Sequence, residues 1–130
     1  MTNMNVILEA KDIVKTYGYE DNKIYATNHI DLQIEEGSFV AIVGRSGSGK
    51  STLLRLLAGL ETATEGEILN DGEVIGNPSL NKGVVFQDYG LFPWMTAGEN
   101  IMLALKQKFP KRNKKELKEI AINMIKAVGL

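Results

Sequence analysis

The chain has 130 residues, 44% of them hydrophobic and 24% charged, with a formal net charge of -1. These values are typical of a globular domain, and they exclude both the strong positive charge that indicates a nucleic-acid partner and the acidic excess of a disordered chain. The absence of cysteine excludes disulfides and thiolate metal sites.

No stretch of the sequence has the length or the pattern of a membrane segment. Residues 1–12 lack the basic segment and the apolar run of a signal peptide. The longest apolar stretches, FVAIVG and LLRLLAGL, fall far short of the ~20 residues that a membrane-spanning helix needs. We therefore expect a cytoplasmic protein whose contact with a membrane is made through a partner.

The N-terminal third has the pattern of β-structure. Residues 6–17 have the composition of a strand, and residues 30–34 alternate apolar and polar side chains, as a half-buried strand does. After a turn at 35–38, the apolar run FVAIV at 39–43 shows no alternation. Such a run is typical of a strand buried on both faces, so we expect it in a parallel sheet.

A glycine-rich loop follows this run. GRSGSGKS at 44–51 matches the pattern G-x-x-x-x-G-K-[ST] in full, between the predicted strand and an apolar segment at 51–60 that predicts a buried helix. Glycines let the backbone curl so that its N–H groups point inward, and a helix start adds unpaired N–H groups and a partial positive charge. Lys50 is expected against the outer phosphates of a nucleotide and the Ser51 hydroxyl on Mg²⁺, whereas Ser46 should contribute its backbone N–H alone. The predicted phosphate-binding residues are Gly44, Ser46, Gly47, Ser48, Gly49, Lys50, Ser51 and Thr52.

The middle of the chain returns to β-structure. Residues 66–76 predict a hairpin, because Asp71 and Gly72 suit the positive φ angles of a tight turn. GVVFQ at 83–87 predicts a further short, buried strand.

Two helices are predicted in the last third. Thr96 and Glu99 form the T-x-x-E of a capping box, so a helix should begin there and end before Pro110. A second helix is indicated by apolar residues spaced as one continuous stripe: Leu117, Ile120, Ala121, Met124, Ile125 and Val128. The order of elements predicts an α/β fold, a P-loop NTPase core with an antiparallel β portion near its N-terminus.

With its flanks, the loop resembles that of the ATP-binding subunit of ABC transporters. The resemblance rests on VKTYG at 14–18, on the continuous stretch from 26 to 60 and on GVVFQDYGLFPW at 83–94, in the family's order, and it covers essentially the whole chain. It implies that Tyr17 stacks on the adenine of ATP and that Gln87 reaches Mg²⁺ and the attacking water. The implied cofactors are ATP and Mg²⁺, with Ser51 and Gln87 as metal ligands. Each residue also has a structural alternative: Tyr17 could be an aromatic that covers the core at a strand end, and Gln87 could be a polar strand terminus.

Within the family, LFPW at 91–94 resembles importers of nitrate, sulfonate and taurine. This narrower likeness implies import, with a transmembrane permease subunit, a second ATP-binding subunit and a solute-binding protein as partners. It also implies a location at the inner face of the cell membrane, held there by the permease. Trp94 and Met95 could face the permease or pack in the core, and the sequence leaves both open.

The residues that complete hydrolysis in the family are not found. After Gln87 there is no apolar run followed by two acidic residues and no Ser-Gly-Gly signature, and His29 lies too early to be the family's switch histidine, so its role should be structural. We expect residues 1–130 to form the N-terminal half of an ABC-type nucleotide-binding domain, truncated at the start of its helical subdomain. Phosphoryl transfer depends on positioning and electrostatic stabilisation, so this chain should bind Mg·ATP without hydrolysing it, and no catalytic residue is predicted.

The predicted strands at 39–43 and 83–87 are not neighbours in the family's sheet, so a gap and open strand edges should favour self-association. A non-transport ABC-type ATPase would be expected to carry basic patches or long insertions, and neither is seen. A nucleotide-binding module that never hydrolyses ATP remains an alternative. A small P-loop kinase would need a lid with arginines, and KFPKRNKK at 108–115 offers one arginine.

Overall fold

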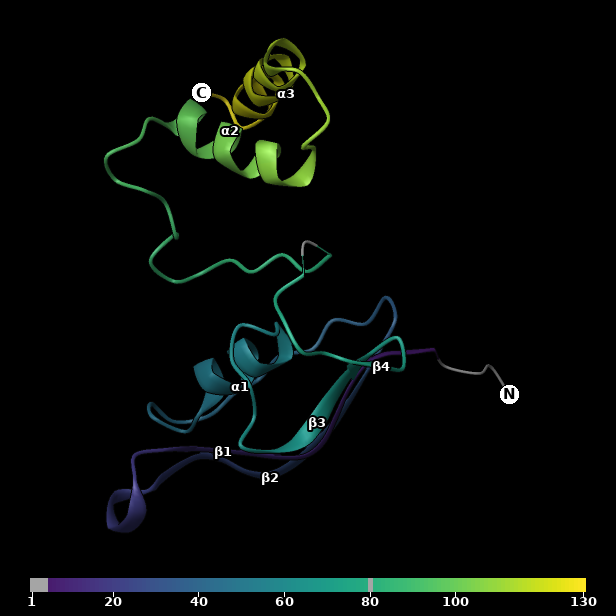
Figure 1. Cartoon of the computed structure of the whole chain (residues 1–130), viewed down its shortest axis with the longest axis vertical. Helices are drawn as coiled ribbons and strands as arrows, with labels where there is room; N and C mark the ends of the chain where they lie inside the picture. The colour runs from purple at the N-terminus through teal and green to yellow at the C-terminus, as the bar shows by residue number, and fades with distance from the viewer. Residues whose placement is uncertain (1–4, 80) are drawn as a thin grey trace. The chain divides into compact units, whose positions relative to one another are not determined.

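The computed structural model describes residues 5–79 and 81–130, and the chain divides into two compact units, Met1–Gly83 and Val84–Leu130 (Figure 1). The first unit holds an antiparallel sheet with one helix, and the second holds two helices. None of the helices in the described part is long and apolar enough to cross a bilayer.

The sheet of the first unit has four strands in the order β2-β1-β3-β4, and each neighbouring pair is antiparallel. Its two long strands are joined through a short 3-10 turn, and its two short strands form a hairpin. The bounds are β1 Val6–Tyr17, η1 Glu20–Asn22, β2 Ile24–Glu35, β3 Glu65–Asn70 and β4 Glu73–Val74. The N-terminal antiparallel portion predicted from composition and alternation is confirmed.

The β3–β4 hairpin turns at the two residues predicted from the sequence. Asp71 and Gly72 have φ angles of 50° and 79°. A two-residue turn with positive φ at both positions has the backbone twist that antiparallel strands need. The predicted hairpin is therefore confirmed, with β4 only two residues long.

An irregularity interrupts the pairing of the two long strands. Asp12 on β1 and His29 on β2 both have positive φ, 51° and 49°, where the register between the strands shifts. Their side chains meet, with His29 Nδ1 2.7 Å from Asp12 Oδ1. His29 thus ties β1 to β2, the structural role expected of it.

The helix α1, Lys50–Leu57, packs on the sheet and forms the core of the first unit. Leu53, Leu56 and Leu57 are buried on it, but Leu54 is exposed, so the prediction of a buried helix is wrong for the face that carries Leu54. The core consists of Ala10, Ile13, Leu53, Leu56, Leu57 and Ile68.

The helix ends earlier than the predicted Leu60 because the chain turns at Gly59. Gly59 has a φ of 76°, its N–H bonds the Leu56 carbonyl at 3.0 Å, and the N–H of Leu60 bonds the Arg55 carbonyl at 2.9 Å. These two bonds are those of a Schellman motif, which satisfies the last helical carbonyls.

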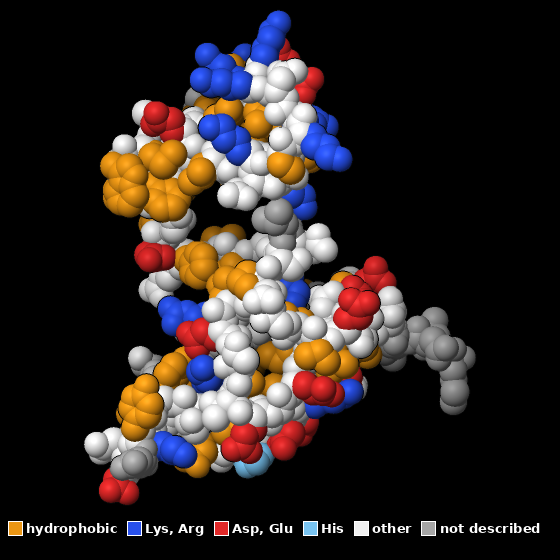
Figure 2. Space-filling view, in the orientation of Figure 1, with side chains coloured by type: hydrophobic (Ala, Val, Ile, Leu, Met, Phe, Trp, Pro, Cys, Tyr) orange, Lys and Arg blue, Asp and Glu red, His pale blue; other side chains and the backbone are white. Residues whose placement is uncertain are grey.

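Two predicted strands are not formed. Residues 39–43 and 83–87 pair with no strand among the described residues, and Phe39 is 97% exposed. An apolar run can become a central parallel strand only with hydrogen-bonding neighbours on both sides, and this sheet offers it none. Val43 and Val85 are exposed as well. Figure 2 shows that hydrophobic side chains, in orange, lie open on the face of the molecule in view.

In the second unit, α2 (Ala97–Lys108) packs against α3 (Lys114–Ala127). The capping box is confirmed, since Thr96 and Glu99 exchange hydrogen bonds at the start of α2, and the helix ends before Pro110 as predicted. Leu105, Leu117 and Ala121 are the buried residues between the helices. The apolar stripe of α3 is only half covered, because Met124 and Val128 are exposed.

The segment before α2 holds Trp94 and Met95, for which the sequence left open a partner contact or packing in the core. Trp94 is 77% exposed, so packing in the core is excluded for it, while Met95 is half-buried. The Trp94 ring lies 5.3 Å from that of Phe92, with the two planes tilted by 52°. Phe92, but not Trp94, also lines a pocket of about 460 Å³ beside α2.

Candidate nucleotide site

The phosphate loop folds directly onto the N-terminus of α1. Gly49 is the N-cap, with a φ of 87°, and its carbonyl accepts the first helical bond from the N–H of Leu53 at 2.9 Å. The N–H groups of the residues between them have no acceptor within the helix. The first turn of α1 therefore presents its N–H groups and partial positive charge where the loop ends, as an anion site requires.

Lys50 folds back over the loop. Its Nζ donates to the carbonyl oxygens of Gly44 and Arg45 at 2.8 and 2.7 Å, and lies 3.3 Å from Ser48 Oγ. These contacts hold the ammonium inside the curl of the backbone. A positive charge fixed there is placed to attract the outer phosphates of a nucleotide.

Gly44 leaves room for the Ser48 side chain inside the loop. A Cβ at position 44 would lie 2.7 Å from Ser48 Oγ and 3.8 Å from Lys50 Cδ, so a side chain would press on the groups that line the loop. The residues present thus fit a phosphate group: a backbone cradle that a Cβ would narrow, a lysine inside it, and hydroxyls at its end. The loop itself is tightened by a bond of 3.2 Å from the N–H of Ser48 to the Arg45 carbonyl.

A pocket of about 250 Å³ lies between the loop and the start of β2. Its loop side is formed by residues 47–52, all of which were predicted from the motif. Its other side is formed by Ile24, Tyr25 and Ala26, which the sequence did not indicate. These residues lie far before the loop in the sequence, and only the antiparallel return of β2 brings them beside it.

The predicted loop residues are therefore brought together, and their exposure suits ligand contact. Ser46, Ser48 and Ser51 are exposed, whereas Lys50 and Thr52 are half-buried. Gly47 has a φ of 79°, a conformation that glycine adopts without strain.

Tyr17 lies at the end of β1 and is held by a residue that the sequence did not indicate. Its hydroxyl donates to Glu61 Oε2, beyond the end of α1. This hydrogen bond raises the pKa of Tyr17, with burial adding to the increase and the Thr52 side chain opposing it. Tyr17 does not line the pocket, so its contact with adenine stays a prediction.

Gln87 lies in an exposed turn of the second unit. The phosphate loop belongs to the first unit, so the joint binding of Mg²⁺ by Ser51 and Gln87 stays a prediction. Within the described residues, no group of three or more histidine, aspartate and glutamate side chains could hold a metal ion, so a cation here would depend on hydroxyl, amide and phosphate oxygens.

The family follows from a match that includes this loop. The model of the family described as ABC transporter matches residues 27–130. The chain belongs to the ABC transporter family. The resemblance drawn from the sequence is confirmed.

Curated relatives agree. An uncharacterised ABC transporter ATP-binding protein of Methanocaldococcus jannaschii is 41% identical over 127 residues, 98% of this chain and 47% of its own length. The aliphatic sulfonates import ATP-binding protein SsuB of Bacillus cereus is 44% identical, over 84% of this chain and 44% of its own length. The nitrate import ATP-binding protein NrtD of Synechocystis is 48% identical, over 76% of this chain and 37% of its own length. The chain thus spans less than half the length of these relatives.

A solved structure supports the fold. The dimeric ATP-binding cassette solved in a post-hydrolysis state with ADP and phosphate superposes with a TM-score of 0.80 at 35% identity. The match covers 92% of this chain and 56% of the cassette. The predicted P-loop NTPase fold class is confirmed, and so is the likeness to nitrate and sulfonate import subunits.

Proposed function

We propose that the chain is the ATP-binding part of an ABC importer subunit, and that residues 1–130 correspond to the N-terminal half of its nucleotide-binding domain. Support for this extent comes from the shares that the chain covers, 47% of the first relative and 56% of the solved cassette. The names of the sulfonate and nitrate relatives support import as the direction of transport.

The proposed ligand is Mg·ATP, and the position of Lys50 carries the proposal. Its ammonium is held inside the loop by the Gly44 and Arg45 carbonyls, and the free N–H groups of α1 follow immediately. The outer phosphates would lie between these positive groups, and the Ser51 hydroxyl would be the protein's ligand to Mg²⁺ from this unit. Gln87 would complete the metal site, and the adenine would lie against Tyr17.

Hydrolysis is not proposed for this chain by itself. Its sequence holds the phosphate cradle but, after Gln87, no acidic pair behind an apolar run to orient the water and none of the Ser-Gly-Gly signature. Since catalysis of phosphoryl transfer is almost entirely positioning and charge stabilisation, a site with binding groups alone should be nearly inert. Any turnover would depend on groups that these 130 residues do not supply.

The proposed partners are a transmembrane permease, a second ATP-binding subunit and a solute-binding protein, with the subunit at the inner face of the membrane. The exposed Trp94 contacts the ring of Phe92, and Phe92 lines an apolar pocket. These residues support a protein contact at this surface, since aromatic residues are enriched where partners bind. The solved cassette is itself dimeric, which supports pairing of two such subunits.

Calorimetric titration of Mg·ATP into the purified chain tests the proposal. Lys50→Ala should weaken binding by at least roughly tenfold, because a hydrogen bond to a charged group contributes about 1.5–3 kcal/mol. Lys118→Ala, a change to an exposed lysine on α3, is the matched control and should leave binding unchanged. Failure of the unchanged chain to bind Mg·ATP while it remains folded, or equal binding by the Lys50 variant, would overturn the assignment. Release of phosphate should stay at background in the same samples.

A further inference from the structure

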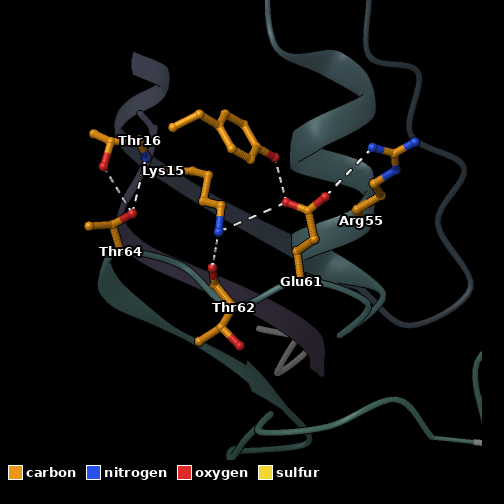
Figure 3. Close-up of polar contacts among 7 residues, drawn as sticks. Lys15, Thr16, Arg55, Glu61, Thr62 and Thr64 are labelled. Atoms are coloured by element: carbon orange, nitrogen blue, oxygen red, sulfur yellow. Dashed lines mark hydrogen bonds and ion pairs between the residues drawn. The ribbon is translucent and has the colours of Figure 1, made fainter. Parts of the chain in front are cut away.

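The hydroxyl of Tyr17 is anchored by an ionic network at the end of α1. Glu61 lies 44 residues beyond Tyr17 in the sequence and accepts its hydrogen bond through Oε2. The other oxygen, Oε1, lies 3.6 Å from Arg55 Nη1, and Lys15 Nζ lies 3.9 Å from Oε2 (Figure 3). The Glu61 side chain is only 25% exposed, so its carboxylate is held from several sides rather than free in solvent.

Lys15 adds a second constraint on the same ring. Its Nζ donates to the Thr62 carbonyl at 2.8 Å, which fixes the ammonium against the turn after α1 (Figure 3). From there it lies 5.3 Å from the centroid of the Tyr17 ring, within the range of a cation–π contact. One face of the ring is thus occupied by a cation, so a flat ligand could stack only on the opposite face. Tyr17 as a whole is 41% exposed, so a ligand can reach part of it.

The Tyr17 hydroxyl is not required to hold the end of β1 against the segment that follows α1. The end of β1 is already tied to the segment after α1 by the bond of 3.0 Å from the N–H of Thr16 to Thr64 Oγ1 and by the Lys15–Thr62 bond. The additional effect of the Tyr17–Glu61 bond is to restrict the Tyr17 side chain to one rotamer, which fixes the orientation of its ring. A side chain held in one rotamer loses less entropy when a ligand stacks on it.

We propose that Glu61 is a positioning residue for the nucleotide base: by accepting the Tyr17 hydroxyl it holds the ring with one face against Lys15 and the other open to the adenine. This inference rests on the proposed binding of ATP. It assigns to Glu61 a part in base affinity and none in the binding of the phosphates, which contact the loop and Lys50.

Comparison of two ligands that differ in the base separates this role from a structural one. Mg·ATP carries the base, and Mg·tripolyphosphate presents the phosphates alone. Glu61→Ala should weaken Mg·ATP by roughly 3- to 10-fold, a part of the contribution that a stacked base makes, and should leave Mg·tripolyphosphate unchanged. Glu61→Gln keeps an oxygen that can accept the hydroxyl, so it should recover most of the loss.

Tyr17→Phe tests the same hydrogen bond from its other end. It should reproduce the loss of Mg·ATP affinity, although it also removes the hydrogen bond between the hydroxyl and the Thr52 side chain. The double variant Tyr17→Phe with Glu61→Ala should lose no more than Tyr17→Phe alone, since the bond to Glu61 is already absent there. Glu67→Ala is the matched control, because Glu67 on β3 also lies beside a lysine, Lys11 at 3.8 Å, but has no link to Tyr17. It should bind both ligands as the unchanged chain does.

The outcomes distinguish the two proposals. Equal affinity of Glu61→Ala and the unchanged chain for Mg·ATP overturns the role of Glu61 while leaving nucleotide binding intact. An equal loss for both ligands also overturns it, because the effect would then be on the loop and not on the base. If Glu61→Ala does not fold, the Mg·ATP affinity of Tyr17→Phe tests the inference by itself. Unchanged affinity in that variant overturns the inference. Failure of the unchanged chain to bind either ligand instead contradicts the proposed function.

Discussion

The carbonyl oxygen of Ala26 on β2 lies directly against the Cα of Gly49, the N-cap of α1. A Cβ built on Gly49 would overlap this oxygen, and the φ of 87° at Gly49 is in the left-handed region. The contact joins the sheet to the phosphate loop at the residue where the helix begins. The position of the loop relative to the sheet therefore depends on the absence of one side chain.

Gly49→Ala should disrupt both stability and ligand binding. The left-handed backbone costs about 1–2 kcal/mol for a residue with a Cβ, and the clash with a backbone atom adds about 1–3 kcal/mol, so the free energy of unfolding should fall by about 2–5 kcal/mol. Gly37→Ala separates the two causes of destabilisation. Gly37 has a φ of 76°, but among the described residues no atom beyond its two chain neighbours lies within 4 Å of the position that a Cβ would take. In Gly37→Ala the free energy of unfolding should fall only by the conformational contribution, about 1–2 kcal/mol, and the affinity for Mg·tripolyphosphate should stay unchanged. Urea unfolding with calorimetric titration measures both, and equal losses in the two variants would contradict the steric argument.

Local pattern was sufficient for the elements whose partners are near in sequence. The turn at Asp71 and Gly72 and the capping box of α2 are each specified by a few adjacent residues, and both were predicted correctly. The glycine-rich loop is specified in the same local way, and its binding of phosphate stays a prediction. Local pattern was insufficient for residues 39–43 and 83–87, whose apolar composition indicates burial but cannot supply the neighbouring strands that a parallel ladder needs.

The site was predictable to the same extent. The loop residues are contiguous, so one motif indicates all of them. Tyr25 and Glu61 could not be found in this way, because the return of β2 and a side-chain contact across 44 residues bring them to the loop and to Tyr17. No spacing rule in the sequence encodes such contacts.

Thr27→Val should leave the chain as stable as before or more stable. Thr27 is 4% exposed, and its Oγ1 has no hydrogen-bond partner within the described residues. A buried hydroxyl without a partner costs about 1–3 kcal/mol, and valine replaces it with a methyl group of nearly the same shape. We expect the free energy of unfolding to rise by up to about 1 kcal/mol in urea unfolding.

Thr64→Val is the matched comparison for this change, with the opposite sign. The Thr64 Oγ1 accepts the N–H of Thr16 at 3.0 Å, so the same substitution removes a hydrogen bond that exists. Its expected cost is about 0.5–1.5 kcal/mol. Destabilisation of equal size in both variants would show that the Thr27 hydroxyl has a partner in solution.

The His29–Asp12 contact should make stability depend on pH. The hydrogen bond and charge of Asp12 raise the pKa of His29 above its ordinary 6.5, with Glu65 and Asp31 adding to the increase and desolvation opposing it. A raised pKa in the folded state means that the stabilisation is fully present below pH 6.5 and is lost as the pH rises through the folded pKa. His29 is the one histidine of the chain, so its ring-proton resonance can be followed by NMR without ambiguity. In Asp12→Asn the titration midpoint should fall toward 6.5, and an unchanged midpoint would exclude Asp12 as the cause.

The capping box should set the stability of the second unit. The Thr96 hydroxyl accepts the N–H of Glu99 at 3.3 Å, and Glu99 Oε2 accepts the N–H of Thr96 at 2.8 Å, so two groups at the start of α2 are satisfied together. Thr96→Ala should therefore cost about 1 kcal/mol, whereas Thr96→Ser keeps the hydroxyl and should cost a few tenths at most. The Thr96 backbone N–H, and after it the Thr96 side chain, lower the pKa of Glu99 from 4.5, so this contribution should be complete above pH 4.5 and fade as the pH falls through the lowered pKa. Thermal unfolding followed by circular dichroism at neutral and acid pH measures both effects. Equal destabilisation by serine and alanine would mean that the threonine methyl group, and not the hydroxyl, holds the helix start.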